Sequence, residues 1–296
     1  MKAIALNTQH PTPDAQCGGR CIVLSPAKVN LFLKVLSKKS DGYHNIVSIV
    51  DIISLYDVIS IEKLEDDVVM VSDDRDVLPE GQANTIYRAA MLLKKIFNIC
   101  SGVKIFVEKH IPIGSGLGGP SSNAATVLKE LVRIWDLKIT VDELADIGKQ
   151  IGADVPLFLF DKPCVMRGIG DEVSSVKLPL LWYLIVYPDM VLSTKMIYEG
   201  LKIVLTKKEN DITLMERFYS VHDIAGLLEN DLETVAIPMC PKIKALKDRL
   251  IEAGAVGALM SGSGSSVFGM FENEREAKKG LSRLGDVGRV FIAHSI

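Results

Sequence analysis

The chain has 296 residues, of which 48% are hydrophobic and 24% are charged. This composition excludes a disordered or coiled-coil protein, and the length suffices for one large or two medium domains with a sizeable core. The 34 Lys and Arg residues against 37 Asp and Glu residues give a net charge of −3, which lacks the basic excess of a dedicated nucleic-acid-binding protein. We therefore expect a small-molecule partner and no nucleic acid.

The cysteines and apolar runs point to a cytoplasmic protein. The five cysteines are scattered and odd in number, which predicts reduced thiols. The longest apolar run, residues 180–187, is far shorter than the ~20 residues that cross a bilayer, so we expect no membrane partner. Residues 1–20 contain no apolar stretch after a basic start, which predicts a loose extension rather than a signal or an anchor.

The first part of the chain is rich in predicted strands. A turn is expected at Ser40-Asp41-Gly42, and an acidic, exposed connection over 66–81. A helix is predicted over 84–97, and an alternating strand over 103–108. The segments in which β-branched residues dominate, and which we expect to be strands, are 21–24, 29–36, 46–55 and 57–63.

The segment Gly114–Ala125 is the strongest local signal for function. Its glycines let the backbone approach a ligand closely, and the helix that follows offers unpaired N–H groups and a positive dipole end. This predicts an anion site, most simply for phosphate. The segment also fits a dinucleotide-binding pattern, but the preceding strand alternates and Asp142 and Glu143 begin another helix. The P-loop pattern fails because Pro120 stands where its lysine belongs.

The rest of the chain mixes helices and strands. Thr140 and Glu143 predict a capping box for a helix that Gly152 ends, and Asp154 follows at once. Because strands and helices do not alternate strictly, we predict an α+β fold. The further expected helices are 195–204, 223–228, 241–253 and 275–284, and the further expected strands are 180–187, 256–260, 267–271 and 289–293.

Three spaced motifs resemble those of the GHMP kinases, which phosphorylate small molecules such as galactose, homoserine and mevalonate. The motifs are Ser25–Leu31, Pro112–Ala125 and Ser261–Phe268, and they stand in the family's order. The resemblance runs from about Cys21 to the C-terminus. It implies ATP and Mg²⁺ as cofactors and a two-domain fold. Residues 1–168 would form an ATP-binding domain like domain 2 of ribosomal protein S5, and residues 169–296 a ferredoxin-like α/β domain.

Further motifs resemble one branch of this family, whose acceptor is a methylerythritol joined to cytidine diphosphate. They are Lys28–Asn30, Asp41–His44 and Gly152–Pro156. The resemblance implies transfer of the ATP γ-phosphoryl group to the acceptor's 2-hydroxyl, a step of the non-mevalonate route to isoprenoid precursors. Asp154 would be the base or orienting carboxylate for that hydroxyl, and Lys28 would pair with it. The alternative is another GHMP-type alcohol kinase, similar to mevalonate or homoserine kinase.

The resemblance also assigns binding residues. Asn30 would bind the acceptor beside Lys28. Tyr43 and Tyr198 would wall the cytosine ring, His44 would hydrogen-bond to the base, and Thr194 would lie close to the cytidine. The positions that match nucleotide contacts are Asn84, Lys109, Pro112, Gly114, Ser115, Gly116, Leu117, Gly118, Gly119, Ser121, Ser122, Asn123 and Ala124.

Other interpretations of these residues stay open at this point. Pro120 replaces a glycine that is usual in the family's loop, which removes one backbone donor. Without the resemblance, Asp154 is equally well explained as a helix cap, and Lys28 as a solvated strand residue. A dehydrogenase and a non-catalytic nucleotide-binding module are competing functions. No magnesium ligand and no oligomeric state is predicted.

Overall fold

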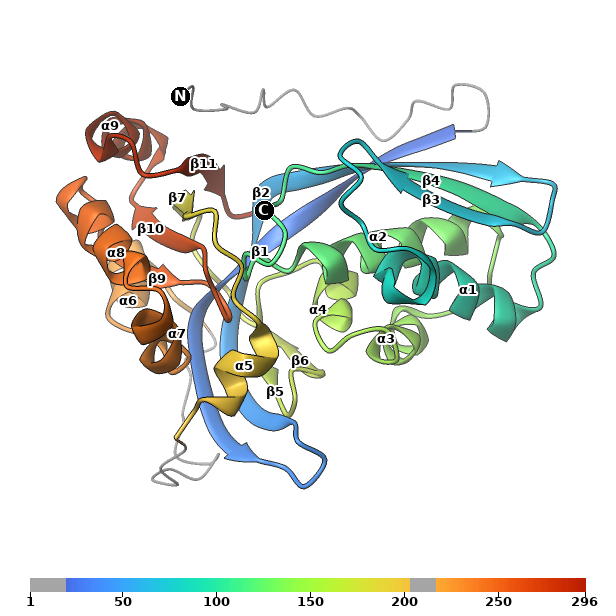
Figure 1. Ribbon diagram of the computed structural model, residues 1–296, viewed down its shortest axis with the longest axis horizontal. Helices are drawn as coiled ribbons and strands as arrows, with labels where there is room; N and C mark the ends of the chain where they lie inside the picture. The colour runs from blue at the N-terminus through green and yellow to red at the C-terminus, as the bar shows by residue number, and fades with distance from the viewer. Residues whose placement is uncertain (1–19, 203–216) are drawn as a thin grey trace.

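The computed structural model describes residues 20–202 and 217–296, which form two sheets with helices packed on them (Figure 1). The predicted extension, apart from Arg20, and the end of the helix predicted over 195–204 lie outside these ranges. The mixture of helices and mostly antiparallel sheets confirms the predicted α+β class.

The larger sheet contains the N-terminal strands. Its main path has the order β3-β4-β2-β1-β8, and β5 pairs with the far end of β2 and in turn with β6. The boundary predicted at residue 168 stays a prediction, although β6 shows that pairing in this sheet continues beyond it. The strands are β1 (Arg20–Lys38), β2 (His44–Leu64), β3 (Val69–Asp73), β4 (Gly102–Glu108), β5 (Cys164–Arg167), β6 (Glu172–Ser175) and β8 (Glu229–Asn230).

Strands β1 and β2 are each continuous where the sequence predicted two strands. Their register shifts between Pro26 and Ala27, whose partners in β2 are Tyr56 and Ile53. Proline has no N–H group to donate to the ladder, so pairing is interrupted there while both strands continue. One irregularity therefore explains both wrongly predicted breaks.

Helices α1 (Thr85–Phe97), α2 (Gly119–Ile134), α3 (Val141–Lys149) and α4 (Val155–Phe160) lie on one side of the larger sheet (Figure 1). Their apolar faces meet those of β2 and β4 in a core cluster. The predicted capping box of α3 is confirmed: Thr140 accepts from the Glu143 N–H, and the Glu143 carboxylate accepts from the Thr140 N–H. Helix α4 was not predicted, and its position decides where Asp154 lies.

The second sheet has the antiparallel order β11-β7-β10-β9, and helices α7, α8 and α9 lie on its outer side (Figure 1). Helix α7 was missed because Pro238 stands inside it. The predicted strand, small-residue loop and strand over 256–271 is confirmed. The elements are α5 (Thr194–Glu199), α6 (Val221–Ala225), α7 (Glu233–Met239), α8 (Lys242–Glu252), α9 (Glu274–Leu284), β7 (Trp182–Tyr187), β9 (Gly257–Met260), β10 (Val267–Phe271) and β11 (Arg289–His294), with a 3₁₀ turn at Gly81–Ala83 in the first half.

Candidate active site

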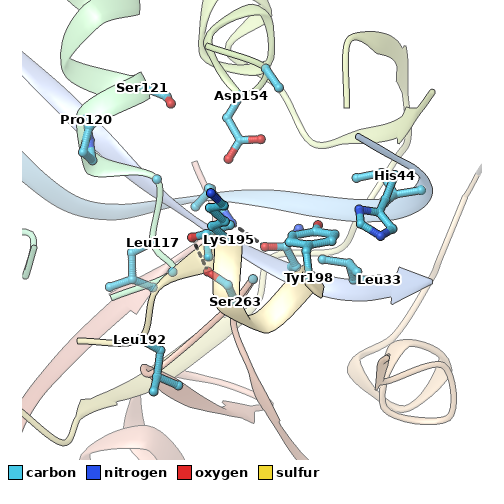
Figure 2. Close-up of a pocket in the computed structure, with 18 of the residues that line it drawn as sticks. Leu33, His44, Leu117, Pro120, Ser121, Asp154, Leu192, Lys195, Tyr198 and Ser263 are labelled. Atoms are coloured by element: carbon cyan, nitrogen blue, oxygen red, sulfur yellow. Dashed lines mark hydrogen bonds between the residues drawn. The ribbon is translucent and has the colours of Figure 1, made fainter. Parts of the chain in front are cut away.

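A pocket of about 800 Å³ brings together segments that lie far apart in the sequence (Figure 2). Its walls come from β1, the β1–β2 turn, the loop before α2, the start of α4, helix α5 and the loop between β9 and β10. All three motifs that suggested a kinase contribute side chains or backbone to it. The pocket is therefore the candidate active site.

The glycine loop is held in shape by the loop between β9 and β10. Gly116 has φ +79°, and a Cβ atom there would lie 2.1 Å from the carbonyl oxygen of Ser261. The Ser261 hydroxyl donates to the Gly116 carbonyl at 3.0 Å, and the Ser266 N–H donates to the Ser115 carbonyl at 3.0 Å. This close approach requires glycine at position 116 and fixes the backbone that would meet a ligand.

The loop leads directly into the N-terminus of α2. Gly118 is the N-cap residue, in the left-handed region, and Pro120 stands in the first turn, where a missing N–H is tolerated. Among the described residues, the N–H groups of Gly116 to Gly119 donate to no protein acceptor. Unpaired amides at the positive end of a 16-residue helix form a site for phosphate groups.

Asp154 is the N-cap residue of α4 by position, but its side chain makes no capping hydrogen bond. Figure 2 shows its carboxylate pointing into the pocket. In the described part of the chain no donor and no cation contacts this carboxylate directly. The explanation of Asp154 as a helix cap therefore does not account for its side chain, which is available to a ligand.

Lys28 lies in the pocket wall on β1, with only 5% of its surface exposed. Burial lowers the pKa of its ammonium group, and the negative charge of Asp154 opposes that shift. Within the described residues Lys28 Nζ donates to Oδ1 of Asn30 and forms no direct ion pair with Asp154, so the pairing of Lys28 with Asp154 during the reaction stays a prediction. Asn30 is two residues along the same strand face, so it is the nearer acceptor for a buried ammonium group.

Asn30 is held in place from several directions. Its Nδ2 donates to Ser48 Oγ at 2.8 Å, and Ser48 Oγ donates to the carbonyl of Phe32 at 2.6 Å. Gly262 of the β9–β10 loop lies against this pair, since a Cβ atom there would be 3.0 Å from Lys28 Nζ. The Lys28 N–H also donates to the carbonyl of Leu117 in the glycine loop at 3.0 Å, so the three motifs meet at Lys28.

An aromatic corner lies farther along the pocket, where the rings of His44 and Tyr198 are 5.1 Å apart between centroids. Burial, and secondarily Lys38, lowers the pKa of His44, so its imidazole is neutral at pH 7. Tyr43 lines the same wall and is 58% exposed. The hydroxyl groups of Thr194 and Ser263 share a hydrogen bond of 2.8 Å. The four residues predicted to surround a cytosine ring thus all line the pocket, and the rings of two of them, His44 and Tyr198, lie together.

Five of the residues predicted to contact the nucleotide do not line this pocket: Asn84, Lys109, Ser122, Asn123 and Ala124. All five are buried. Asn84 caps helix α1 by accepting the Ile86 N–H at 2.9 Å, and Ser122 shares a hydrogen bond with Ser25 at 2.8 Å. Their contact with a nucleotide stays a prediction.

Lys109 and Asn123 both bind Asp57, a residue that the sequence analysis missed. The Asp57 carboxylate is fully buried and accepts from Lys109 Nζ, from Asn123 Nδ2 at 3.0 Å and from the N–H groups of His110 and Ile111 at 2.8 and 2.9 Å. This network connects β2, the end of β4 and helix α2, and so positions the phosphate loop. The signal in the sequence was an isolated acid inside an apolar strand.

Within residues 20–202 and 217–296, no group of three or more His, Cys, Asp or Glu side chains is arranged to hold a metal ion. No helix there combines the length and apolar character that crossing a bilayer needs.

Both halves of the chain match models of one family. Residues 84–162 match "GHMP kinases N terminal domain", and residues 212–290 match "GHMP kinases C terminal". These ranges contain the glycine loop, Asp154 and the β9–β10 loop. The matched ranges therefore include segments that meet in the pocket.

Similar proteins give a finer placement. The chain is 42% identical to 4-diphosphocytidyl-2-C-methyl-D-erythritol kinase of Syntrophus aciditrophicus, over 93% of this chain and 99% of that protein, and 40% identical to the protein of that name from Geotalea daltonii, over 91% and 96%. A crystal structure of 4-(cytidine 5'-diphospho)-2C-methyl-D-erythritol kinase matches with a TM-score of 0.76 and 30% identity, covering 92% of this chain and 98% of that one. The chain therefore belongs to the GHMP kinases and, within them, to the 4-diphosphocytidyl-2-C-methyl-D-erythritol kinase family, and it has their two-domain fold.

Proposed function

We propose that the protein transfers the γ-phosphoryl group of ATP to the 2-hydroxyl of 4-diphosphocytidyl-2-C-methyl-D-erythritol. The observation that carries this proposal is the meeting, in one pocket, of unpaired glycine-loop amides, the free carboxylate of Asp154 and the His44–Tyr198 corner. The first suits a triphosphate, the second an alcohol, and the third a flat base. The acceptor gives the proposed reaction a role in isoprenoid precursor synthesis, and the need for ATP gives it a cytoplasmic setting.

In the proposed reaction the acceptor oxygen attacks the γ-phosphorus, and the bond between that phosphorus and the β–γ bridging oxygen breaks. ADP leaves, and the hydroxyl proton passes to the Asp154 carboxylate or is oriented by it. The Lys28 ammonium group donates to Asn30 and is attracted by the Asp154 charge. It stabilises the negative charge that develops on the transferred group. Positioning and charge thus supply most of the catalysis.

The pocket residues fit a magnesium ion that arrives with ATP. Mg²⁺ keeps several waters and takes one or two protein oxygens besides the phosphates, so a cluster of three protein ligands is not needed. The hydroxyl of Ser121, in the first turn of α2, is a protein oxygen that would hold it. When bound, the ion would neutralise charge on the phosphate oxygens.

The alternative acceptors are those of other GHMP kinases. Solved mevalonate and homoserine kinases share the fold with TM-scores of 0.70 and 0.64, but at 18% identity they indicate the fold alone. A feature of this chain that favours a cytidine compound is the corner of His44 and Tyr198, since a small alcohol would leave it unfilled.

The test is ADP release with ATP, Mg²⁺ and a panel of acceptors: the cytidyl compound, mevalonate, homoserine and galactose. We expect turnover with the cytidyl compound and a new phosphomonoester at its 2-hydroxyl, identified by phosphorus NMR. Turnover with mevalonate or homoserine alone would support the alternative. ATP binding without turnover on any alcohol would contradict an enzyme function.

A further inference from the structure

Helix α5 brings a further side chain to the pocket, Lys195. It precedes Tyr198 by three residues, so both side chains lie on one face of the helix, and both line the pocket (Figure 2). The hydroxyl contact between Thr194 and Ser263 at 2.8 Å holds the start of α5 against the β9–β10 loop. The backbone of α5 at Lys195 is therefore held beside the pocket.

The charges of the pocket make Lys195 distinctive. The charged residues that line it are Lys28, Lys195, Asp41, Asp154 and Glu199. Lys28 is buried and already donates to Asn30. The Lys195 side chain is 82% exposed, and its contact within the described residues is an ion pair with Glu199 at 3.9 Å. Lys195 is therefore the pocket-lining cation that a second phosphate group can reach.

We propose that Lys195 binds the diphosphate of the acceptor, an assignment that rests on the proposed function. In the acceptor this diphosphate connects the cytidine to the polyol. With the base at His44 and Tyr198 and the reacting hydroxyl at Asp154, the diphosphate must cross the space between them, which Lys195 borders. The glycine-loop amides serve the donor triphosphate, so the acceptor phosphates need a cation of their own.

The test is equilibrium binding of cytidine and of CDP, measured by calorimetry. The wild type should bind CDP more tightly than cytidine. Lys195→Ala should weaken CDP binding about tenfold, or ~1.4 kcal/mol, and leave cytidine binding unchanged, because a partly exposed lysine–phosphate contact is of this size. Lys195→Arg should keep most of the CDP affinity, and Glu199→Gln should raise it about twofold, since a like charge beside the phosphates is removed.

Lys244 provides a matched control. It forms an exposed i,i+4 ion pair with Asp248 on α8, of the same kind as Lys195 with Glu199, away from the pocket. Lys244→Ala should change neither affinity. In turnover, Lys195→Ala should raise the KM for the cytidyl acceptor about tenfold, with kcat and the KM for ATP near their original values.

Each outcome bears on one proposal. If Lys195→Ala keeps the wild-type preference for CDP, weakens cytidine and CDP equally, or raises the KM for ATP instead, the assignment of Lys195 is overturned while the kinase function stands. If the wild type binds neither cytidine nor CDP and releases no ADP with the cytidyl acceptor, the proposed function itself fails.

Discussion

Replacing Asp154 by Asn tests both the proposed base and its influence on Lys28. The Asp154 side chain has no donor in the described part of the protein, so the change leaves no buried group unpaired. We expect the free energy of unfolding to fall only slightly, through the lost attraction between the Asp154 charge and the buried Lys28 ammonium. Loss of a general base costs about 10²-fold or more in rate, which corresponds to ~2.7 kcal/mol or more in the barrier.

The same substitution should alter the pH profile. Asp154 is the charge that raises the pKa of Lys28 against the effect of burial. Without it the pKa of Lys28 falls further, so the ammonium group loses its proton at lower pH. We expect the alkaline limb of the residual activity to move to lower pH in Asp154→Asn.

The assay is ADP release coupled to pyruvate kinase and lactate dehydrogenase, across the range in which the wild type is folded. Asp161→Asn is the matched control, because Asp161 ends the same helix α4, is solvent-exposed and pairs with Lys129. It has a left-handed backbone that Asn also tolerates, so its rate should equal that of the wild type. A near-normal rate for Asp154→Asn, or an alkaline limb that moves to higher pH, would refute the reasoning.

Three further substitutions test other parts of the account. Asp57→Asn should lower the free energy of unfolding in urea by about 3–5 kcal/mol, because it leaves the buried Lys109 ammonium without a counter-charge, with the neutral Asn123 Oδ1 at 3.2 Å as its remaining acceptor. Adding Lys109→Met should recover part of the loss, and an unchanged midpoint and slope would contradict this. Gly116→Ala should lower kcat/KM for ATP at least about tenfold. Gly81→Ala should not, because Gly81 also has a positive φ but no atom lies within 4 Å of a Cβ there. Equal effects of the two substitutions would refute the loop contact. Burial raises the pKa of Asp51 to about 6, so its contribution to stability is present below about pH 4 and is lost as pH rises through 6. Asp51→Asn should therefore gain stability relative to wild type by up to ~3 kcal/mol between pH 4 and 8 in paired thermal melts, and a difference independent of pH would contradict that pKa.

The parts of the structure that could be predicted from the sequence are those that depend on local chemistry. The glycines before α2 and the capping box at Thr140 each require their own residues for backbone reasons, so they could be located without the fold. The aromatic and histidine residues after the Asp41 turn could be named only through the resemblance. The structure places His44 beside Tyr198, more than 150 positions away.

The parts that could not be predicted depend on long-range packing. Asp57 belongs to a strand that looks apolar. Its partners Lys109, just after β4, and Asn123, in α2, approach it through packing that no local pattern encodes. The hydrogen-bond partner of Lys28 could not be predicted for a similar reason. Whether a buried ammonium group reaches Asn30 or Asp154 depends on the angle between β1 and the start of α4, which is a property of the assembled fold.

The most direct test of the central claim is a crystal structure of the ternary complex with a non-hydrolysable ATP analogue, Mg²⁺ and 4-diphosphocytidyl-2-C-methyl-D-erythritol. We predict that the analogue's phosphates lie on the amides of Gly116 to Gly119, and that the acceptor's 2-hydroxyl lies within hydrogen-bond distance of the Asp154 carboxylate. An acceptor whose 2-hydroxyl lies away from Asp154, or a triphosphate bound elsewhere than on the glycine loop, would contradict the account.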